Sequence, residues 1–224
     1  MALVEIKKSD YQQGSLQLAI GPNSQLLSYI QEYGEQSFRQ LLGLYYDDAV
    51  ANDRQKYTDL YNGTQYTDEH GEFNSFVGQG LAYVVRRFIY FYFLRDTQTI
   101  NSDTGTVSNR NENAVQQLGY GRVRAETRYR EAVLAYNCNV LPFLMNFRDV
   151  EREVIAQVGN TLEVSDTLYL SAGDAIMVGE SEAVVSNVTA TTFDIDIVGS
   201  FVDDVAIWAP FEDIPMQPLS SLTF

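Results

Sequence analysis

Four aspartates near the C-terminal end are the residues best placed to do chemistry. Asp194 and Asp196 alternate with apolar residues, and Asp203 and Asp204 follow a few positions later. Hard cations such as Ca²⁺ bind several oxygen ligands at once, so this group could hold a calcium ion. The chain has no twelve-residue calcium loop, however, and the alternation places Asp194 and Asp196 on the solvent face of a strand. We therefore predict no bound metal there.

Other catalytic residue types are scarce. His70 is the only histidine, which excludes a histidine-built zinc or iron site. Cys138 is the only cysteine, which excludes an intramolecular disulfide and a cysteine-built metal site. We expect His70 in a surface loop and Cys138 in an apolar helical core. The chain has no serine nucleophile elbow, and its Gly-x-Gly sequences fit no phosphate loop. These observations predict a protein that is not an enzyme and has no cofactor.

Six arginines in two largely apolar segments are the candidate binding residues, and two interpretations stay open. In the structural one they form the polar stripe of two helices and pair with Glu126 and Glu131. In the functional one they bind an acidic surface of a partner subunit, or DNA phosphate. The strong negative charge of the chain argues against DNA as the main ligand. These arginines are Arg86, Arg87, Arg122, Arg124, Arg128 and Arg130.

Two aromatic residues complete the candidate partner interface. Trp208 is the only tryptophan, and Phe211 follows it in the sequence VAIWAPF. Trp208 either closes the end of a small β core or anchors an interface, and tryptophan is common in both roles. We favour the core, with the interface as the alternative.

Charge is unevenly distributed along the 224 residues. The chain holds 30 acidic and 15 basic residues, a net charge of −15. From Glu151 onward there are 13 acidic residues and one basic residue, Arg152, so this part should repel nucleic acid. The first residues show no charged-then-apolar pattern, so we expect no signal sequence, and the apolar run at Phe88–Leu94 is too short to span a bilayer. We expect a protein of a soluble compartment with no membrane partner.

Apolar spacing predicts helices over residues 23–42, 45–51, 54–61, 75–97 and 112–147. The last of these should break at Gly119-Tyr120-Gly121 and kink at Pro142. Gly78 and Gly80 should let another backbone approach closely. Residues 1–22, which include an alternating SLQLAI sequence, are expected to form an extended arm, and 23–150 a helical domain.

Residues 151–212 have a different sequence pattern, with short runs of Val, Ile, Thr and Phe between turn residues. Expected strands include EVIAQV, TLYL, DAIMV, EAVVSNVTA, TTFDIDIV and VAIWAPF. This pattern is typical of a small antiparallel barrel or sandwich, and residues 213–224 read as an extended tail. The predicted class is α+β, with an N-terminal bundle of about four helices, a C-terminal β domain and extended terminal arms.

Several short motifs between residues 23 and 147 carry a family resemblance. They are Leu41-Leu42-Gly43 before Tyr45-Tyr46, Asn62-Gly63, GEFNSFVG at 71–78, Ala82-Tyr83 through Phe88 and Tyr90, Thr104-Gly105-Thr106-Val107, and Glu112-Asn113-Ala114. In these motifs the chain resembles the head–tail connector or adaptor proteins that lie under the portal in the neck of tailed bacteriophages. The sequence most resembles the connector proteins of phages that infect Bacteroidetes hosts, including the crAss-like group.

The resemblance implies a ring of identical subunits, dodecameric if it mates directly with the portal. It implies contacts with the portal protein and other neck or tail proteins, passage of DNA without specific binding, and neither catalysis nor a cofactor. We expect a virion protein, cytoplasmic in the host before assembly. Two departures are Gly78-Gln79-Gly80, where the family has a glycine followed by a larger apolar residue, and the β domain, which minimal connectors lack.

Two alternative functions remain. A binding module whose β domain recognises a glycan, a fibre or a host surface would be supported by exposed aromatic residues on that domain. A metal-dependent enzyme would act through the acidic clusters, and absence of metal from the purified protein would exclude it.

Overall fold

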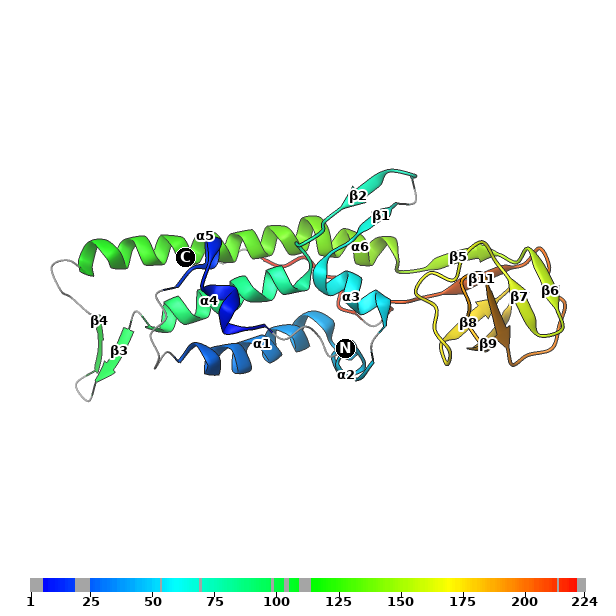
Figure 1. Cartoon of the computed structure of the whole chain (residues 1–224), viewed down its shortest axis with the longest axis horizontal. Helices are drawn as coiled ribbons and strands as arrows, with labels where there is room; N and C mark the ends of the chain where they lie inside the picture. Colours follow the sequence, from blue (N-terminus) through cyan, green and yellow to red (C-terminus); the bar gives the residue numbers. More distant parts are fainter. Residues whose placement is uncertain are drawn as a thin grey trace. The chain divides into compact units, whose positions relative to one another are not determined.

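A computed structural model describes residues 6–18, 25–52, 54–68, 70–97, 99–102, 105–108, 114–212 and 214–220, with the side chains of 97–122 outside the description. The chain forms two compact units. Unit 1 contains Met1–Asp53, Tyr57–Pro142 and Ile214–Phe224, and unit 2 contains Arg54–Lys56 and Phe143–Asp213. Helices dominate the N-terminal part and an antiparallel sheet the C-terminal part (Figure 1). The predicted α+β class is confirmed.

Unit 1 is built around three helices, with α4 in contact with both α1 and α5 (Figure 1). Two antiparallel hairpins, β1–β2 and β3–β4, flank α4 in sequence. The elements from the N-terminal side to the unit boundary are η1 (Lys8–Tyr11), η2 (Gly14–Leu16), α1 (Leu26–Leu42), α2 (Tyr45–Ala51), α3 (Gln55–Asn62), β1 (Gln65–Thr67), β2 (Phe73–Ser75), α4 (Leu81–Thr97), β3 (Thr99–Ser102), β4 (Gly105–Ser108), α5 (Ala114–Ala135), the π-helical turn η3 (Tyr136–Val140) and α6 (Leu141–Asn146).

The central position of α4 explains its wide apolar surface. Val84, Val85 and Ile89 are fully buried, because neighbouring helices cover two sides of α4. A helix that is apolar on most sides must be buried on most sides, as the sequence predicts. Aromatic rings join α4 to its neighbours, with Tyr33 of α1 stacked on Tyr92 at 4.5 Å between centroids.

The start of α4 differs from the prediction, because residues 73–75 form strand β2 and the helix begins at Leu81. Phe76 N donates to Thr64 O and Gly78 N to Asn62 O, so the chain continues the hairpin instead of starting a helix. Of Gly78 and Gly80, only Gly80 lies close to other backbone atoms. A Cβ atom there would lie 2.4 Å from Gly63 N, whereas the space around Gly78 is open.

The predicted break at Gly119-Tyr120-Gly121 is wrong, because α5 runs without interruption from Ala114 to Ala135. The irregularity comes later, in the π-helical turn η3, directly before Pro142. Proline lacks an N–H group and its ring clashes with the carbonyl group four residues earlier. A π-helical turn absorbs such a misfit within a continuous helical segment.

The N-terminal segment packs on unit 1 where the structure describes it, in place of the expected extended arm. Residues 6–18 contain two 3₁₀ turns. The Tyr11 side chain is fully buried, and its hydroxyl donates to Arg86 O over 3.1 Å. This segment therefore covers α4 of its own chain.

Unit 2 is a curled antiparallel sheet, a half-barrel, with strand order β5-β11-β8-β9-β10-β7-β6 (Figure 1). The end strands of this order, β5 and β6, are consecutive in the chain and separated only by Val154 and Ile155. Val154 N donates to Asp204 O and Ile155 N to Glu163 O, so the bend continues both ladders. The strands are β5 (Val150–Glu153), β6 (Ala156–Val158), β7 (Thr161–Glu163), β8 (Ala175–Val178), β9 (Ser181–Ser186), β10 (Thr192–Ile195) and β11 (Val205–Trp208).

Alternating side chains fill the core of unit 2, including Ile176, Val185 and Phe193. The predicted strand over Thr167–Leu170 is wrong, because this segment turns and Tyr169 has a φ of 61°. The Tyr169 ring packs within 5.3 Å of Phe147 between centroids, so aromatic packing holds the turn. Strand β7 was missed instead, since it offers a single buried apolar residue among polar neighbours.

Within the described residues, the structure contains no helix with the length and apolar character needed to cross a membrane.

Candidate interaction surfaces

Two of the predicted interface arginines lie in an ion-pair cluster inside unit 1. Arg87 on α4 is 6% exposed, and its Nε donates to Glu131 Oε2 of α5 over 3.1 Å. Arg128 donates to the other carboxylate oxygen of Glu131. Arg87 also covers the Tyr83 ring and donates to Tyr83 O. This cluster matches the structural interpretation of the arginines, with Glu131 as the shared partner.

The pKa values of this cluster reflect its burial. Desolvation lowers the pKa of Arg87, although its hydrogen bond to Glu131 opposes the shift. Burial alone would raise the pKa of Glu131, but hydrogen bonds from Arg128 and Arg87 outweigh it and hold the pKa below its usual range. Glu131 is therefore ionised at neutral pH and clamps α4 to α5.

Arg86 and Arg124 bind the N-terminal segment of the same chain. Arg86 Nε donates to Asp10 Oδ2 over 3.1 Å, next to the buried Tyr11. Arg124 on α5 donates through Nη2 to the carbonyl oxygens of Ser15 and Gln17. Both arginines therefore fasten residues 6–18 to the helices.

The remaining two candidate arginines are Arg122 and Arg130. The Arg122 side chain lies outside the described residues. Arg130 is exposed, and none of the ion pairs found among the described residues includes it. It shares one face of α5 with Val123, Thr127 and Leu134, at helical spacings of four, three and four. Val123 and Leu134 are each 62% exposed. We call these four residues the α5 face.

Trp208 and Phe211 belong to the core of unit 2. Trp208 is 3% exposed, and its indole N–H donates to Leu168 O over 2.9 Å. Phe211 is fully buried and packs against Phe143 and Tyr169, each 5.7 Å away between ring centroids. Both side chains are buried, so the core interpretation holds for Trp208, and the prediction of Phe211 in a partner interface is wrong.

Other aromatic residues of unit 2 are also withdrawn from solvent. Phe143, Phe147, Phe193 and Phe201 are buried, and Tyr169 is half-buried. Protein sites that stack sugars present exposed aromatic faces. The described part of unit 2 lacks such a platform, which leaves the glycan-binding alternative without its expected support.

The four aspartates are dispersed by the fold. Asp194 accepts hydrogen bonds from Thr161 and Asn187, which lower its pKa. Asp196 is exposed and accepts the backbone N–H of Val184 over 2.8 Å. A search of the described residues finds no group of three or more His, Cys, Asp or Glu side chains able to hold a metal ion.

His70 and Cys138 both lie at the surface. His70 is exposed at the tip of the β1–β2 hairpin, as predicted. Asp68 organises this tip by accepting the backbone N–H groups of His70 and Glu72. Cys138 is exposed, so the prediction of a core thiol is wrong. The π-helical turn η3 changes the rotation of successive residues, which an unbroken 3.6-residue periodicity cannot anticipate.

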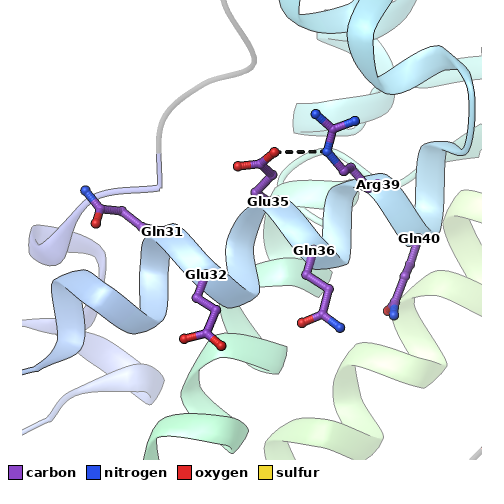
Figure 2. Close-up of a pocket in the computed structure, with 6 residues that line it drawn as sticks. All are labelled: Gln31, Glu32, Glu35, Gln36, Arg39 and Gln40. Carbon is purple, nitrogen blue, oxygen red and sulfur yellow. Dashed lines mark hydrogen bonds and ion pairs between the residues drawn. The ribbon is translucent and has the colours of Figure 1, made fainter.

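A shallow hollow of about 500 Å³ lies along α1, and Figure 2 shows its six polar side chains. Glu35 accepts from Arg39 Nε over 2.9 Å, an exposed pair one helical turn apart. Glu32, Gln36 and Gln40 project from another side of the helix. Surface pairs of this kind contribute little to stability, and the residues that line this hollow are all polar or charged.

A second groove, of about 290 Å³, lies on the outer face of the half-barrel. Its apolar residues come from neighbouring strands, since Met177 of β8 pairs directly with Ile207 of β11. Its rim carries three carboxylates, those of Asp149, Glu182 and Glu212, and no basic residue lines it.

The tail is fixed to unit 1 by side-chain recognition of its backbone. Asn137 Oδ1 accepts the N–H of Leu219 over 2.8 Å, and Asn137 Nδ2 donates to Leu219 O over 2.9 Å. Tyr136 donates its hydroxyl to Pro215 O, and burial raises its pKa to about 12. Asn137 thus pairs with the tail as a neighbouring strand would.

The comparisons with known proteins add no name. Neither a family model, nor a curated protein, nor a solved structure matches this chain. A function must therefore rest on the chain's own residues and surfaces.

Sequence reasoning missed Asn137, the outer groove of unit 2 and the α5 face. An asparagine in a helix gives no signal of a partner 82 residues away. The sequence contained a partial indication of the groove. Side chains in DAIMV and VAIW alternate between the two faces of a strand, which places Met177 and Ile207 on the outer face. The α5 face could have been found from the helical spacing of Val123, Thr127, Arg130 and Leu134.

Proposed function

We propose that this protein is a non-catalytic structural component of the neck of a tailed bacteriophage, where its copies form a ring between portal and tail. The resemblance of residues 23–147 to head–tail connectors supports this role. The α5 face carries the proposal, because it presents two exposed apolar residues and the cation Arg130 on one side of a long helix.

Exposed apolar residues in register along a helix are suited to contact with another subunit. In a ring each subunit uses two different surfaces, so the α5 face would meet another part of the next copy. Several residues of types common in catalysis have structural contacts: Glu131, Arg87 and Arg128 join helices, Asp194 accepts from Thr161 on the neighbouring strand, and Asp68 organises a turn.

The charge of the C-terminal part agrees with a channel that DNA crosses without adhering. With 13 acidic residues against one basic residue from Glu151 onward, this part repels phosphate at short range. The proposed neighbours are the portal protein and other neck or tail proteins, and the proposed location is the virion, after synthesis in the host cytoplasm.

Native mass spectrometry combined with negative-stain imaging tests the ring. We expect closed rings of the purified chain, or rings that form on addition of the portal protein. Leu134→Asp should abolish them, because it places a charge in the subunit contact. Leu44→Asp is the matched control, since Leu44 is 83% exposed in the same unit and lies away from α5.

Two results would overturn the proposal. One is a chain that stays monomeric with and without portal protein. The other is the absence of the chain from purified virions of the phage that encodes it, as measured by mass spectrometry. Equal loss of rings in both leucine variants would remove the α5 face from the contact.

A further inference from the structure

The outer face of unit 2 has an ordered arrangement of apolar and acidic side chains that the fold itself does not use. Strand register places Glu182, Met177, Ile207 and Glu151 in one row across β9, β8, β11 and β5. The row is apolar at its centre and acidic at both ends. Because direct partners on neighbouring strands point to the same face, these side chains share one surface.

Neighbouring rows add further apolar residues and one acidic residue to this face. Ala175 pairs with Val184, and Val205 pairs with Glu153. Met177, Val184 and Val205 are between 41% and 47% exposed, although each has a fully or nearly fully buried neighbour in sequence. These apolar side chains therefore lie on the surface of the folded unit and are not part of its core.

The acidic rim of this face keeps most of its charge. Arg54 is engaged with Asp174 at 3.0 Å, and Lys56 is buried with its Nζ on Pro210 O. Arg148 lies 3.8 Å from Asp149, and both side chains are largely exposed. An ion pair with this separation and this exposure to solvent neutralises little of the negative charge of the rim.

We propose that this groove binds an extended segment of another protein in which lysine or arginine side chains flank apolar ones. Apolar side chains of the segment would cover Met177 and Ile207, and its cations would meet Glu182 and Glu212 on the rim. This complementarity of charge and shape is what selects a protein partner of that composition. Nucleic acid does not fit, since the rim repels phosphate. The inference goes beyond the ring, because it holds whether or not the helical unit oligomerises.

The test uses the full chain labelled at its methionine methyl groups and observed by NMR. The chain has four methionines, of which Met177 lies in the groove while Met145 and Met216 lie elsewhere. The probe is a short synthetic peptide of alternating lysine and valine. One control peptide has glutamate in place of lysine, and the other has serine in place of valine.

We expect the lysine–valine peptide to shift the Met177 signal and to leave Met145 in place. Both control peptides should bind at least tenfold more weakly. The double variant Glu182→Gln and Glu212→Gln should weaken binding by about tenfold at low salt, and less at high salt, because two exposed charge pairs are lost. Glu163→Gln, an exposed carboxylate on β7 outside the groove, should leave affinity unchanged.

Any of four outcomes would overturn the proposal. They are no shift of Met177 with the lysine–valine peptide, an equal shift with the lysine–serine peptide, equal weakening in Glu163→Gln, and a Met177 shift that follows protein concentration without peptide. The last outcome would mean that a second copy of this chain occupies the groove. Unchanged methyl signals of the free variants would show that they remain folded.

Discussion

Arg87 shows how a single residue joins two helices of unit 1. Among the candidate arginines whose side chains the structure describes it is the most buried, and its charge is balanced by Glu131 across the α4–α5 contact. Removal of one member of such a pair leaves the other charged and desolvated, which costs more than the pair itself contributes. The arginine pattern was recognisable in the sequence, but its function in packing follows from this pairing.

Glu131→Gln tests this clamp through pH. The Glu131 pKa is lowered in the folded chain, so its contribution to stability is complete above its unfolded value near 4.5 and is lost as pH falls through the folded value. We expect a loss of about 2 kcal/mol at neutral pH and a flatter decline of stability below about pH 4.5. Urea unfolding followed by circular dichroism measures both. Glu32→Gln, on the surface of α1, should change neither.

Gly80→Ala tests a close contact between backbone segments. The added Cβ would lie 2.5 Å from the carbonyl oxygens of Leu60 and Tyr61, so backbone must move. We expect a loss of more than about 3 kcal/mol, seen as faster hydrogen exchange in α3 and α4. Gly78→Ala is the matched control: its φ of 75° is strained for alanine but its surroundings are open, which predicts a loss of roughly 1 kcal/mol. Similar losses would contradict the contact.

At the scale of elements, a bend between β5 and β6 brings the two end strands of the half-barrel together. Strands β5 and β6 serve opposite ends of the ladder and are joined through Val154 and Ile155. Exposed edge strands invite pairing with other chains, and this bend limits that risk. Alternation along β8 then separates a core face from the outer groove.

Ile176→Ala and Met177→Ala test that alternation at adjacent positions. Ile176 is 2% exposed and Met177 is 41% exposed. Truncating the first leaves a cavity and should cost about 3 kcal/mol, whereas the second should cost less than about 1 kcal/mol. Trp208 fluorescence during urea unfolding reports on unit 2, because this is the only tryptophan and it is buried there. A larger loss for Met177→Ala would show that the strand register is wrong.

Helix and strand periodicity predicted the α+β layout, the bounds of α2 and most strands of unit 2, because these depend on neighbours in sequence. Contacts between distant residues could not be predicted. Arg86 pairs with Asp10, 76 residues away, and this pairing helps to pack residues that were expected to form an extended arm. The position of Trp208 also depended on which side of β11 faces the core, which a four-residue strand leaves open.

At the scale of the whole molecule, the residues that follow unit 2 belong again to unit 1. Residues 214–220 lie on unit 1, held by Asn137 and Tyr136. Ile214 is 3% exposed, so an apolar contact supports these hydrogen bonds. The tail is therefore bound by its own chain where the structure describes it.

Asn137→Ala should release the tail without unfolding the helices. Loss of both hydrogen bonds to Leu219 predicts at least tenfold faster amide exchange at residues 217–220, with global stability reduced by about 1 kcal/mol. Mass spectrometry of hydrogen exchange measures this directly. Asn139→Ala, which removes only an exposed bond to Gln79, should leave the tail protected. Unchanged protection in Asn137→Ala would mean that the Tyr136 hydrogen bond and the burial of Ile214 hold the tail without Asn137.

Because Tyr136 Oη and Pro215 O are 3.1 Å apart, residues 143–213 are an insertion whose two ends return to nearly the same place in unit 1. Pro142 is six residues beyond Tyr136, about 9 Å along a helix, so a few glycines would rejoin the chain after excision. Such a layout lets recombination exchange one β module for another while the helical unit stays intact.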